Sequence, residues 1–457
     1  MVKLFIRINV LIILAWVIYA CKPASEKITP DSNARLEFSR DTILFDTLFT
    51  SIGSSFRRLT VFNPNENAVK ISSINVGGLA SSEYNVIING RESHFESDVE
   101  LRGKDSLFIL VRVNINPQNQ ELPYLVKDSI LFLTNSNLQK VMLVAYGQDA
   151  NFITNKTLDC NTTWDSPKPY VIYGHASIPE GCSLTIKPGT RILFSEKSHL
   201  QVNGTLIAEG EEENEVIFSS DKLTQRLKNQ PGLWSGIIFG SSSTGNQLKK
   251  VKIRNAENGI RVKNSGNPAT PSLVLDKVII ENMSFNGIKA INAHVSVQNT
   301  LIHNCAAYAF QGSGGGTYTL LHVTLANYSF NFFRNGTTLL ISDTYFSEDG
   351  TKVQNPVSAN FTNCIIWGDK TEELTMTKSP SGLPDHSFTN CLLRTRLGIT
   401  GENNLLNTDP EFDSPRQGTF VLRENSPAIS AAIDAGITTD LAGKTRPSPP
   451  SIGAYEH

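Results

Sequence analysis

The sequence has few charged residues for its length and no excess of either sign. Charged residues make up 18% of the 457 positions, and the formal net charge is −2. A coiled coil or a long disordered tail would be richer in charge, and a nucleic-acid-binding surface would need a basic excess. We therefore predict a globular chain that has no nucleic acid partner. Its length calls for two or more domains or a repeat array.

Long hydrophobic runs are also missing. The most apolar stretch covers residues 8–20 and follows Lys3 and Arg7. A positive start and an apolar run too short to cross a bilayer comfortably are typical of a signal peptide. We therefore predict that residues 1–20 are a signal peptide. An uncleaved N-terminal anchor is the alternative.

The residues VIYA followed by Cys21 resemble the lipobox of bacterial lipoproteins, with Tyr19 where that family usually has a small residue. The resemblance is to lipoproteins of Bacteroidota-like cells. It implies that Cys21 is lipidated and anchors the chain in the cell envelope, at the outer membrane, facing either the periplasm or the cell surface. Residues 21–35 are polar and contain proline, which suits a tether.

Cysteine is scarce, and its spacing excludes a common type of metal site. No C-x-x-C occurs, so the sequence predicts no zinc site and no cofactor. Beyond Cys21 five cysteines are left, and an odd number in an oxidising compartment leaves at least one free thiol. Cys160 and Cys182 are the candidates for a disulfide near the start of the second domain.

Residues 36–148 have the pattern of an all-β sandwich. Short runs such as RRLTVF and SLFILVRV alternate apolar and polar residues between N-P, G-G and N-G breaks, which predicts about seven strands. The stretch FDTLFTSIGSSFRRLTVFNPN, residues 45–65, resembles the opening of Hydin-type immunoglobulin-like domains. That resemblance implies a spacer or an interaction module.

The second half of the chain contains a repeat. FTNCIIWG at residues 361–368 is nearly copied by FTNCLLRT at residues 388–395. Seven hexapeptides align with the shared core at intervals of 20–27 residues: KVKIRN from Lys250, KVIIEN from Lys277, NTLIHN from Asn299, HVTLAN from His322, DTYFSE from Asp343, NCIIWG from Asn363 and NCLLRT from Asn390. A period of this length is one turn of a solenoid, in which like positions stack about 4.8 Å apart.

The second and fourth positions of the hexapeptides are predicted to point into the bore. They are Val251, Val278, Thr300, Val323, Thr344, Cys364 and Cys391, then Ile253, Ile280, Ile302, Leu325, Phe346, Ile366 and Leu393. Alternation along a strand puts both positions on one face. Cys364 and Cys391 are then small core residues, although a Cys364–Cys391 disulfide is the alternative. The sixth position holds Asn255, Asn282, Asn304 and Asn327, which predicts a column of turn residues with left-handed backbone.

The outward positions carry the predicted site. Position three is too apolar for a wet surface, so we expect a cover, either residues 369–386 or the first domain. Position five is mixed and suits solvent or a ligand. Its candidate ligand face consists of Arg254, His303, Trp367 and Arg394.

Residues 165–457 resemble a right-handed parallel β-helix, because IPEGCSLTIKPGTRILF is similar to the entry turns of that fold. At the end, DPEF, SPAI, IDAG, DLAGKTRP and IGAYE occur in the order found in the choice-of-anchor Q domain. Ser451 stands where that family commonly has Asp. The resemblance implies a C-terminal cap over about residues 405–457.

Enzymes that cut acidic polysaccharides are common on such folds, but the sequence gives little sign of their chemistry. A hydrolase needs two placed carboxylates, and the chain has no Asp-Asp dipeptide. A lyase needs a basic residue beside a neutralised uronate. Outward cations exist in Lys252, Arg254, Lys289 and Arg394, while the glutamates of residues 211–215 suit a solvated loop. We therefore predict a non-enzymatic module that binds a glycan or a surface protein. A polysaccharide lyase or hydrolase that acts on an acidic polysaccharide is the alternative.

Overall fold

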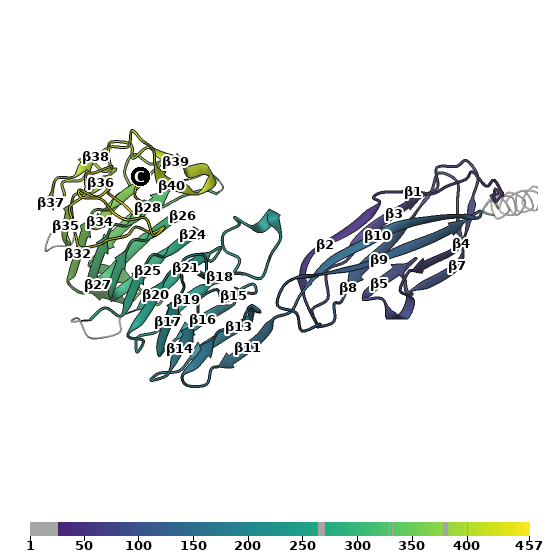
Figure 1. The fold of residues 1–457 in the computed structure, drawn as a ribbon, viewed down its shortest axis with the longest axis horizontal. Coiled ribbons are helices and arrows are strands. Elements are labelled where there is room, and N and C mark those ends of the chain that lie inside the picture. The colour runs from purple at the N-terminus through teal and green to yellow at the C-terminus, as the bar shows by residue number, and fades with distance from the viewer. Residues whose placement is uncertain (1–25, 264–269, 329, 331, 378–382, 400) are drawn as a thin grey trace, which may run out of the picture. The chain divides into compact units, whose positions relative to one another are not determined.

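The computed structural model describes residues 26–263, 270–328, 330, 332–377, 383–399 and 401–457. The chain is all-β there, and its contacts divide it into two compact units, residues 1–149 and 150–457 (Figure 1). The predicted signal peptide and the predicted lipid anchor Cys21 lie outside the described residues. No helix in the described part of the chain is long and apolar enough to span a membrane.

The first unit consists of two five-stranded sheets that enclose one core. Strands such as β8 bury every second side chain, as expected for sheets with one face inward. Tyr84 donates a hydrogen bond from its hydroxyl to the carbonyl oxygen of Val126, which ties the two sheets together at 2.9 Å. The first sheet, in spatial order, contains β1 (Glu37–Phe38), β3 (Arg57–Phe62), β8 (Ser106–Val113), β5 (Tyr84–Ile88) and β6 (Arg91–Glu92). The second contains β2 (Thr42–Phe49), β10 (Asn137–Gln148), β9 (Tyr124–Thr134), β4 (Val69–Val76) and β7 (Phe95–Leu101). A short 3₁₀ helix, η1 (Leu79–Ser81), follows β4.

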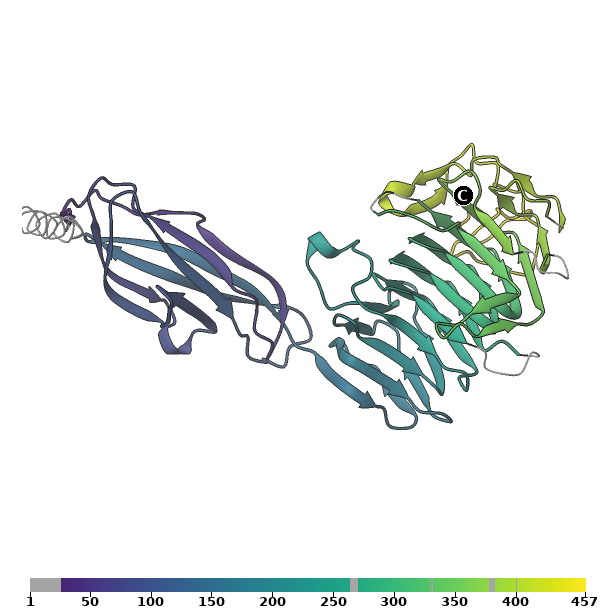
Figure 2. The ribbon, with the colours of Figure 1, turned by 180° about the vertical axis from the view of Figure 1, so that it is seen from behind.

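The second unit is dominated by one sheet of 26 strands whose pairs run parallel (Figures 1 and 2). Over most of its length each strand pairs with the strand three further along the chain, so the strands fall into three stacks, here called faces 1, 2 and 3. This pairing explains the sequence period, because one repeat supplies one strand to each stack.

Face 1 contains β11 (Asn151–Thr157), the start of β13 (Tyr170–Ile178), β15 (Arg191–Phe194), β18 (Val216–Ser220), β21 (Val251–Arg254), β24 (Ile279–Met283), β26 (Leu301–Cys305), β28 (Thr324–Asn327), β33 (Ile365–Gly368), β36 (Leu392–Leu393) and β38 (Leu405–Leu406). Face 2 contains the end of β13, β16 (His199–Val202), β19 (Gly236–Phe239), β22 (Ile260–Lys263), the starts of β25 (Ile288–Gln298) and β27 (Phe310–Leu321), β29 (Leu339–Ser342) and β34 (Leu374–Thr377). Face 3 contains β12 (Thr162–Trp164), β14 (Ser183–Ile186), β17 (Thr205–Glu209), β20 (Asn246–Lys249), β23 (Leu273–Asp276), the ends of β25 and β27, β32 (Val357–Thr362), β35 (Asp385–Thr389) and β37 (Gly401–Glu402).

The elements outside these stacks are short. η2 (Gln225–Leu227) lies between β18 and β19, and β30 (Thr344–Phe346) pairs with β31 (Lys352–Gln354) as an antiparallel hairpin. The C-terminal segment, residues 407–457, contains β39 (Phe412–Ser414), η3 (Pro415–Gln417) and β40 (Thr419–Leu422), and β39 pairs with β40.

The inward faces of the stacks share one continuous hydrophobic core. The predicted inward residues are buried in six of the seven aligned hexapeptides, from Val251 and Ile253 to Cys391 and Leu393. The prediction was wrong for the fifth hexapeptide, because Phe346 is 63% exposed. Its strand belongs to the β30–β31 hairpin, and β28 pairs directly with β33 instead. The hairpin is an insertion between two rungs, and its sequence has the same alternating pattern as the repeat.

Three residues of the predicted asparagine column have left-handed backbone, and a second column appears. The prediction was wrong for Asn327, which ends β28 without a positive φ angle. Asn255, Asn282 and Asn304 have positive φ angles of 65°, 61° and 54°. The first hexapeptide positions are also left-handed, a feature the sequence analysis missed. They are Lys250, Lys277, Asn299, His322, Asn363 and Asn390, with φ angles between 45° and 55°. These residues stand just before the strands of face 1 from β21 to β36. Each of these strands therefore follows a sharp left-handed turn, which asparagine tolerates well.

Candidate functional site

The four residues of the predicted ligand face do lie along one line of face 1. Strand register places Arg254 beside Glu281, Glu281 beside His303, His303 beside Ala326, and Ala326 beside Trp367. The guanidinium of Arg394 lies 4.9 Å from the ring centre of Trp367. Arg254 lies at the other end, where its Nε donates to the hydroxyl of Ser219 at 3.0 Å.

The middle of this line is not open to solvent, contrary to the prediction for position five, whereas Arg254 and Arg394 are half-buried. His303 is 2% exposed and Trp367 is 4% exposed. Phe420 of the C-terminal segment packs against the His303 ring with a centroid distance of 4.8 Å. Trp367 belongs to a hydrophobic cluster with Phe412 and Ile452 of the same segment. The apolar third position does have a cover, and it is the C-terminal segment rather than residues 369–386, because Leu301, Ile365 and Leu392 pack against that segment.

An ionic group lies beneath this cover. Glu281 accepts from Lys252 Nζ at 3.1 Å and lies 3.2 Å from His303 Nε2. Burial raises the pKa of Glu281, but the hydrogen bond and charge of His303 and the charge of Lys252 outweigh it and hold the pKa at about 2. The carboxylate is therefore charged at neutral pH and already paired. It neutralises neighbouring cations and holds no proton for catalysis.

The quoted C-terminal motifs contact the large sheet. In DLAGKTRP and IGAYE, Arg446 pairs with Glu456 at 2.5 Å, and both side chains are almost fully buried. Arg446 also donates to Asn299 Oδ1 at 3.0 Å, which connects the segment to a turn of the large sheet. Glu456 accepts from the backbone N–H of Ser451 at 3.0 Å. The backbone of Ser451 therefore helps to hold the buried Glu456 carboxylate.

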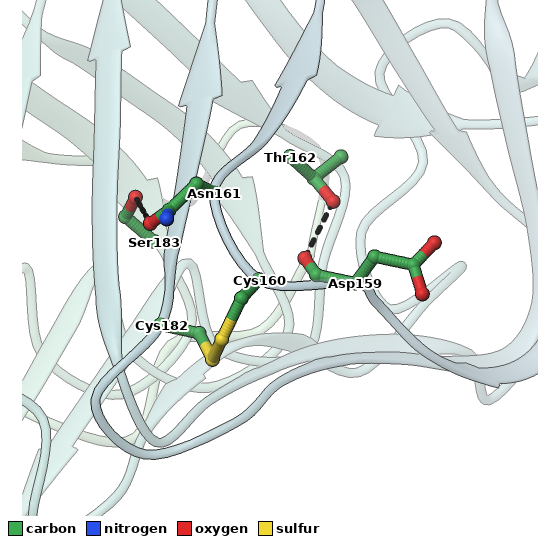
Figure 3. Close-up of a disulfide and its surroundings, with 6 residues drawn as sticks. All are labelled: Asp159, Cys160, Asn161, Thr162, Cys182 and Ser183. Carbon is green, nitrogen blue, oxygen red and sulfur yellow. Dashed lines mark hydrogen bonds between the residues drawn. A yellow bond between two sulfur atoms is a disulfide. The ribbon is translucent and has the colours of Figure 1, made fainter.

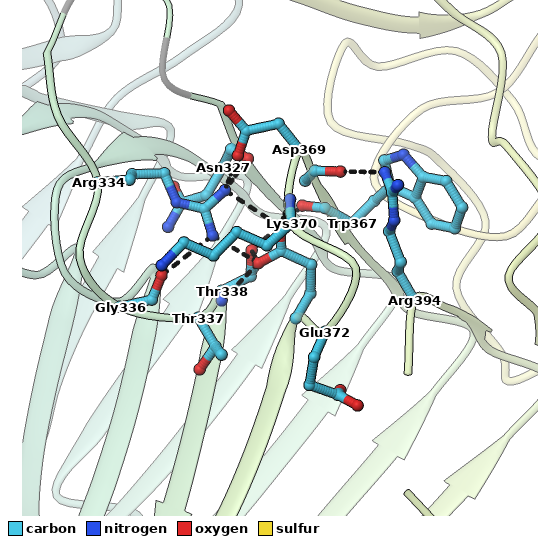
Figure 4. Close-up of polar contacts among 12 residues, drawn as sticks. Asn327, Arg334, Gly336, Thr337, Thr338, Trp367, Asp369, Lys370, Glu372 and Arg394 are labelled. Atoms are coloured by element: carbon cyan, nitrogen blue, oxygen red, sulfur yellow. Dashed lines mark hydrogen bonds and ion pairs between the residues drawn. The ribbon is translucent and has the colours of Figure 1, made fainter. Parts of the chain in front are cut away.

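A second buried network lies next to Trp367 (Figure 4). Arg334 bonds to Glu373 through Nη2 and Oε2 at 2.5 Å and to Asp369 Oδ1 at 2.7 Å. Thr338 donates to the same Glu373 oxygen from its N–H and from its hydroxyl, at 2.9 and 2.7 Å. The Glu373 carboxylate is thus saturated by structural donors. Because it bridges segments far apart in sequence, it holds the turns of this region in place.

The cysteines divide into one bonded pair and three buried thiols. Cys160 and Cys182 form a disulfide, with Cα atoms 4.7 Å apart (Figure 3). Cys305, Cys364 and Cys391 are free and buried. The alternative of a Cys364–Cys391 disulfide is therefore wrong in this structure. Burial raises the pKa of the Cys305 thiol to about 12, so this thiol is a poor nucleophile.

The glutamates of residues 211–215 contribute to a cavity of about 170 Å³. Glu212 pairs with Lys250, whose side chain is 8% exposed, so the expected solvated loop has one specific contact. Leu441 and Tyr455 of the C-terminal segment complete the lining. In the described part of the chain, no group of three or more His, Cys, Asp or Glu side chains is placed to hold a metal ion.

The polar line that does reach solvent lies on face 2. Strand register stacks Arg261 beside Lys289 and Lys289 beside Gln311 on neighbouring rungs. Arg261 is exposed, and Lys289 and Gln311 are half-buried. The sequence pattern indicated Lys289 as an outward cation but did not reveal Arg261, because the aligned hexapeptides belong to face 1. The alternation IRVK over residues 260–263 was the available signal.

No protein-family model matches the chain, and no curated protein matches it. The resemblances to lipoproteins, Hydin-type domains and the choice-of-anchor Q domain thus rest on the quoted residues alone. Among solved structures, the chain is similar to PapD-like domain 7 of human CEP192 at 10% identity, covering 28% of this chain and 99% of that domain, with a TM-score of 0.18. It is similar to the catalytic unit of a GH87 alpha-1,3-glucanase from Streptomyces thermodiastaticus at 10% identity, covering 77% and 89%, with a TM-score of 0.22.

A third likeness is to a family 123 glycoside hydrolase from Clostridium perfringens at 7% identity, with a TM-score of 0.18. That match covers 25% of this chain and 26% of the hydrolase. The chain also spans less than two thirds of three further solved structures that it matches. TM-scores this low do not establish a shared fold or function.

Proposed function

We propose that the chain is an exported, lipid-anchored protein whose second unit is a right-handed parallel β-helix that binds a glycan at the cell envelope without cleaving it. Cys21 carries the lipid, residues 21–35 form the tether, and the N-terminal sandwich spaces the second unit from the outer membrane. The three parallel stacks, the shared bore and the left-handed turns support the β-helix assignment.

The observation that carries the binding proposal is the outward line of face 2. Its polar side chains follow one another in register along the stack and reach solvent. A polysaccharide is a chain of similar units, and a solenoid repeats its surface at a fixed rung spacing of about 4.8 Å. Such a surface suits an extended repeating ligand. Binding of a surface protein is the other reading of the same face.

An enzymatic role has one observation in its favour. Burial raises the pKa of Asp221, which follows β18, and its Oδ1 lies 3.5 Å from Lys222 Nζ. A carboxyl with a raised pKa can act as a general acid. A lyase or hydrolase of acidic polysaccharides is therefore the second candidate, with Asp221 as its proton donor. A hydrolase would still need a second carboxylate across the scissile bond.

A glycan array combined with analysis of the products tests both functions. The proposed binder retains one class of glycan and releases neither unsaturated nor reducing ends. Release of such ends, abolished in Asp221→Asn, would establish the enzyme instead. If the wild-type protein binds no glycan and releases no product, the glycan-binding proposal fails, and a pull-down with envelope proteins then tests the protein-binding reading.

A further inference from the structure

Face 2 carries an unusual run of positive charge, here called the basic stripe: Arg261, Lys263 and Lys289. Arg261 and Lys263 extend from β22 and are exposed, while Lys289 extends from β25 and is half-buried. The register pairs Arg261 directly with Lys289. Along the stack of face 2, Gln311 is the next register neighbour after Lys289. In the opposite direction, Ile238 is the register neighbour of Arg261, and Gln201 is that of Ile238.

The charges of the basic stripe lack intramolecular compensation. Arg261, Lys263 and Lys289 form no ion pair with any residue that the structure describes, whereas Lys252, Arg334 and Arg446 of the same unit do. Like charges directly opposite each other on neighbouring strands destabilise a sheet. The column therefore has an electrostatic cost that an anionic ligand would remove.

Aromatic rings border the basic stripe at two places. The Tyr345 ring of the β30–β31 hairpin lies 5.3 Å from Lys289 Nζ. On the other side, the His175 and His199 rings stack with centroids 5.8 Å apart. Burial, helped by His175 and Arg261, lowers the pKa of His199, so its imidazole is neutral at pH 7. Rings beside polar side chains provide flat surfaces against which sugar rings can pack.

We propose that the basic stripe binds a linear anionic polysaccharide of the uronate class, lying along face 2. Arg261 contacts a carboxylate through two parallel N–H groups, Lys289 supplies a point charge one rung away, and the amides of Gln201 and Gln311 bond to hydroxyl groups. This inference rests on the proposed glycan-binding function and adds the chemical class of the ligand and its location.

Binding to polygalacturonate tests the inference, with its fully methyl-esterified form as the uncharged ligand. Alginate, chondroitin sulfate and dextran complete the panel. Titration of the full mature chain should show binding to one or more anionic polymers, weaker binding at high salt because of screening, and none to the ester. Arg261→Gln/Lys289→Gln should lose at least about tenfold in affinity.

Lys249→Gln is the matched control. Lys249 is exposed on face 3, and its register neighbours are Glu209 and Asp276, so this variant removes one positive charge outside the basic stripe, against two in the double variant. Its affinity should equal that of the wild type. None of the three substituted side chains is buried, so we expect both variants to fold. Circular dichroism and thermal melting check this.

Two results overturn the inference while leaving the proposed function intact. One is equal affinity of the double variant and the wild type, and the other is preference for dextran or the methyl ester over every anionic polymer. Absence of binding to any polymer of the panel and to a wider glycan array would overturn the inference and the glycan-binding function together.

Discussion

At Asn363 and Asn390 the chain passes through left-handed backbone, with φ angles of 55° and 49°. Both asparagines also bond to the C-terminal segment. Asn363 Nδ2 donates to the carbonyl oxygen of Ile433 at 2.8 Å, and Asn390 Nδ2 donates to that of Ala431 at 3.0 Å. The recurring F-T-N-C thus combines a turn residue that docks the cover with a cysteine that fills the bore.

This double role gives a prediction for Asn363. We expect Asn363→Ala to lower the free energy of unfolding by about 3–5 kcal/mol, because left-handed backbone costs a non-glycine residue about 1–2 kcal/mol and three side-chain hydrogen bonds are lost, one with His322 and two with the backbone of Ile433. Asn363→Gly keeps the turn and should lose about 1–2 kcal/mol less. Urea denaturation measures both. Equal losses in the two variants would show that the backbone angle contributes nothing.

At the scale of elements, the C-terminal segment is attached by a buried ion pair. We predict that Arg446→Met destabilises the protein by about 3–5 kcal/mol, because it leaves Glu456 charged and buried without its partner. Arg446→Met/Glu456→Leu should recover part of this loss. Arg423→Met is the control, since Arg423 is half exposed and its carboxylates are at least 3.8 Å away, so its loss should stay below about 1 kcal/mol. A control loss as large as that of Arg446→Met would contradict the account.

The attachment should also weaken in acid, through His322. Burial and the charge of Arg446 lower the pKa of His322 from 6.5 to about 3. The unfolded chain therefore binds a proton between pH 6.5 and 3 that the folded chain does not, and stability falls as the pH drops through this window. We expect a slope of up to about 1.4 kcal/mol per pH unit.

His322→Asn should flatten this slope, because asparagine does not titrate in this range. The variant should still fold, because asparagine also accepts the left-handed turn. Urea denaturation at a series of pH values from 7 to 5.5 measures the slope. This range lies above the pH at which Glu281, whose pKa falls from 4.5 in the unfolded chain to about 2 in the folded chain, contributes to the acid response. Identical slopes in the variant and the wild type would show that another group controls the acid response.

The sequence indicated the stacked strands well because inward positions repeat strictly, as at Ile253, Ile280 and Ile302. It did not reveal the hairpin at Phe346, because an inserted strand with alternating residues has the same local pattern as a rung. It could not identify the cover either. The burial of His303 and Trp367 depends on Phe420 and Phe412, whose approach is a tertiary contact between segments far apart in sequence.

At the scale of the whole molecule, covering face 1 directs the proposed binding role to another surface. The C-terminal segment covers His303 and Trp367 of the predicted ligand face, while the basic stripe on face 2 reaches solvent. Arg261 belongs to a strand outside the aligned hexapeptides, so the charge of this face emerges only when β22 and β25 are placed side by side.

Lysine acetylation footprinting with and without bound polygalacturonate tests this account most directly. The polymer should shield Lys263 and Lys289 from acetylation and leave Lys249 on face 3 unchanged, with the modified sites measured by mass spectrometry. Shielding of Lys249 alone, or equal labelling of all three lysines when polymer is bound, would contradict the claim that the ligand lies along face 2.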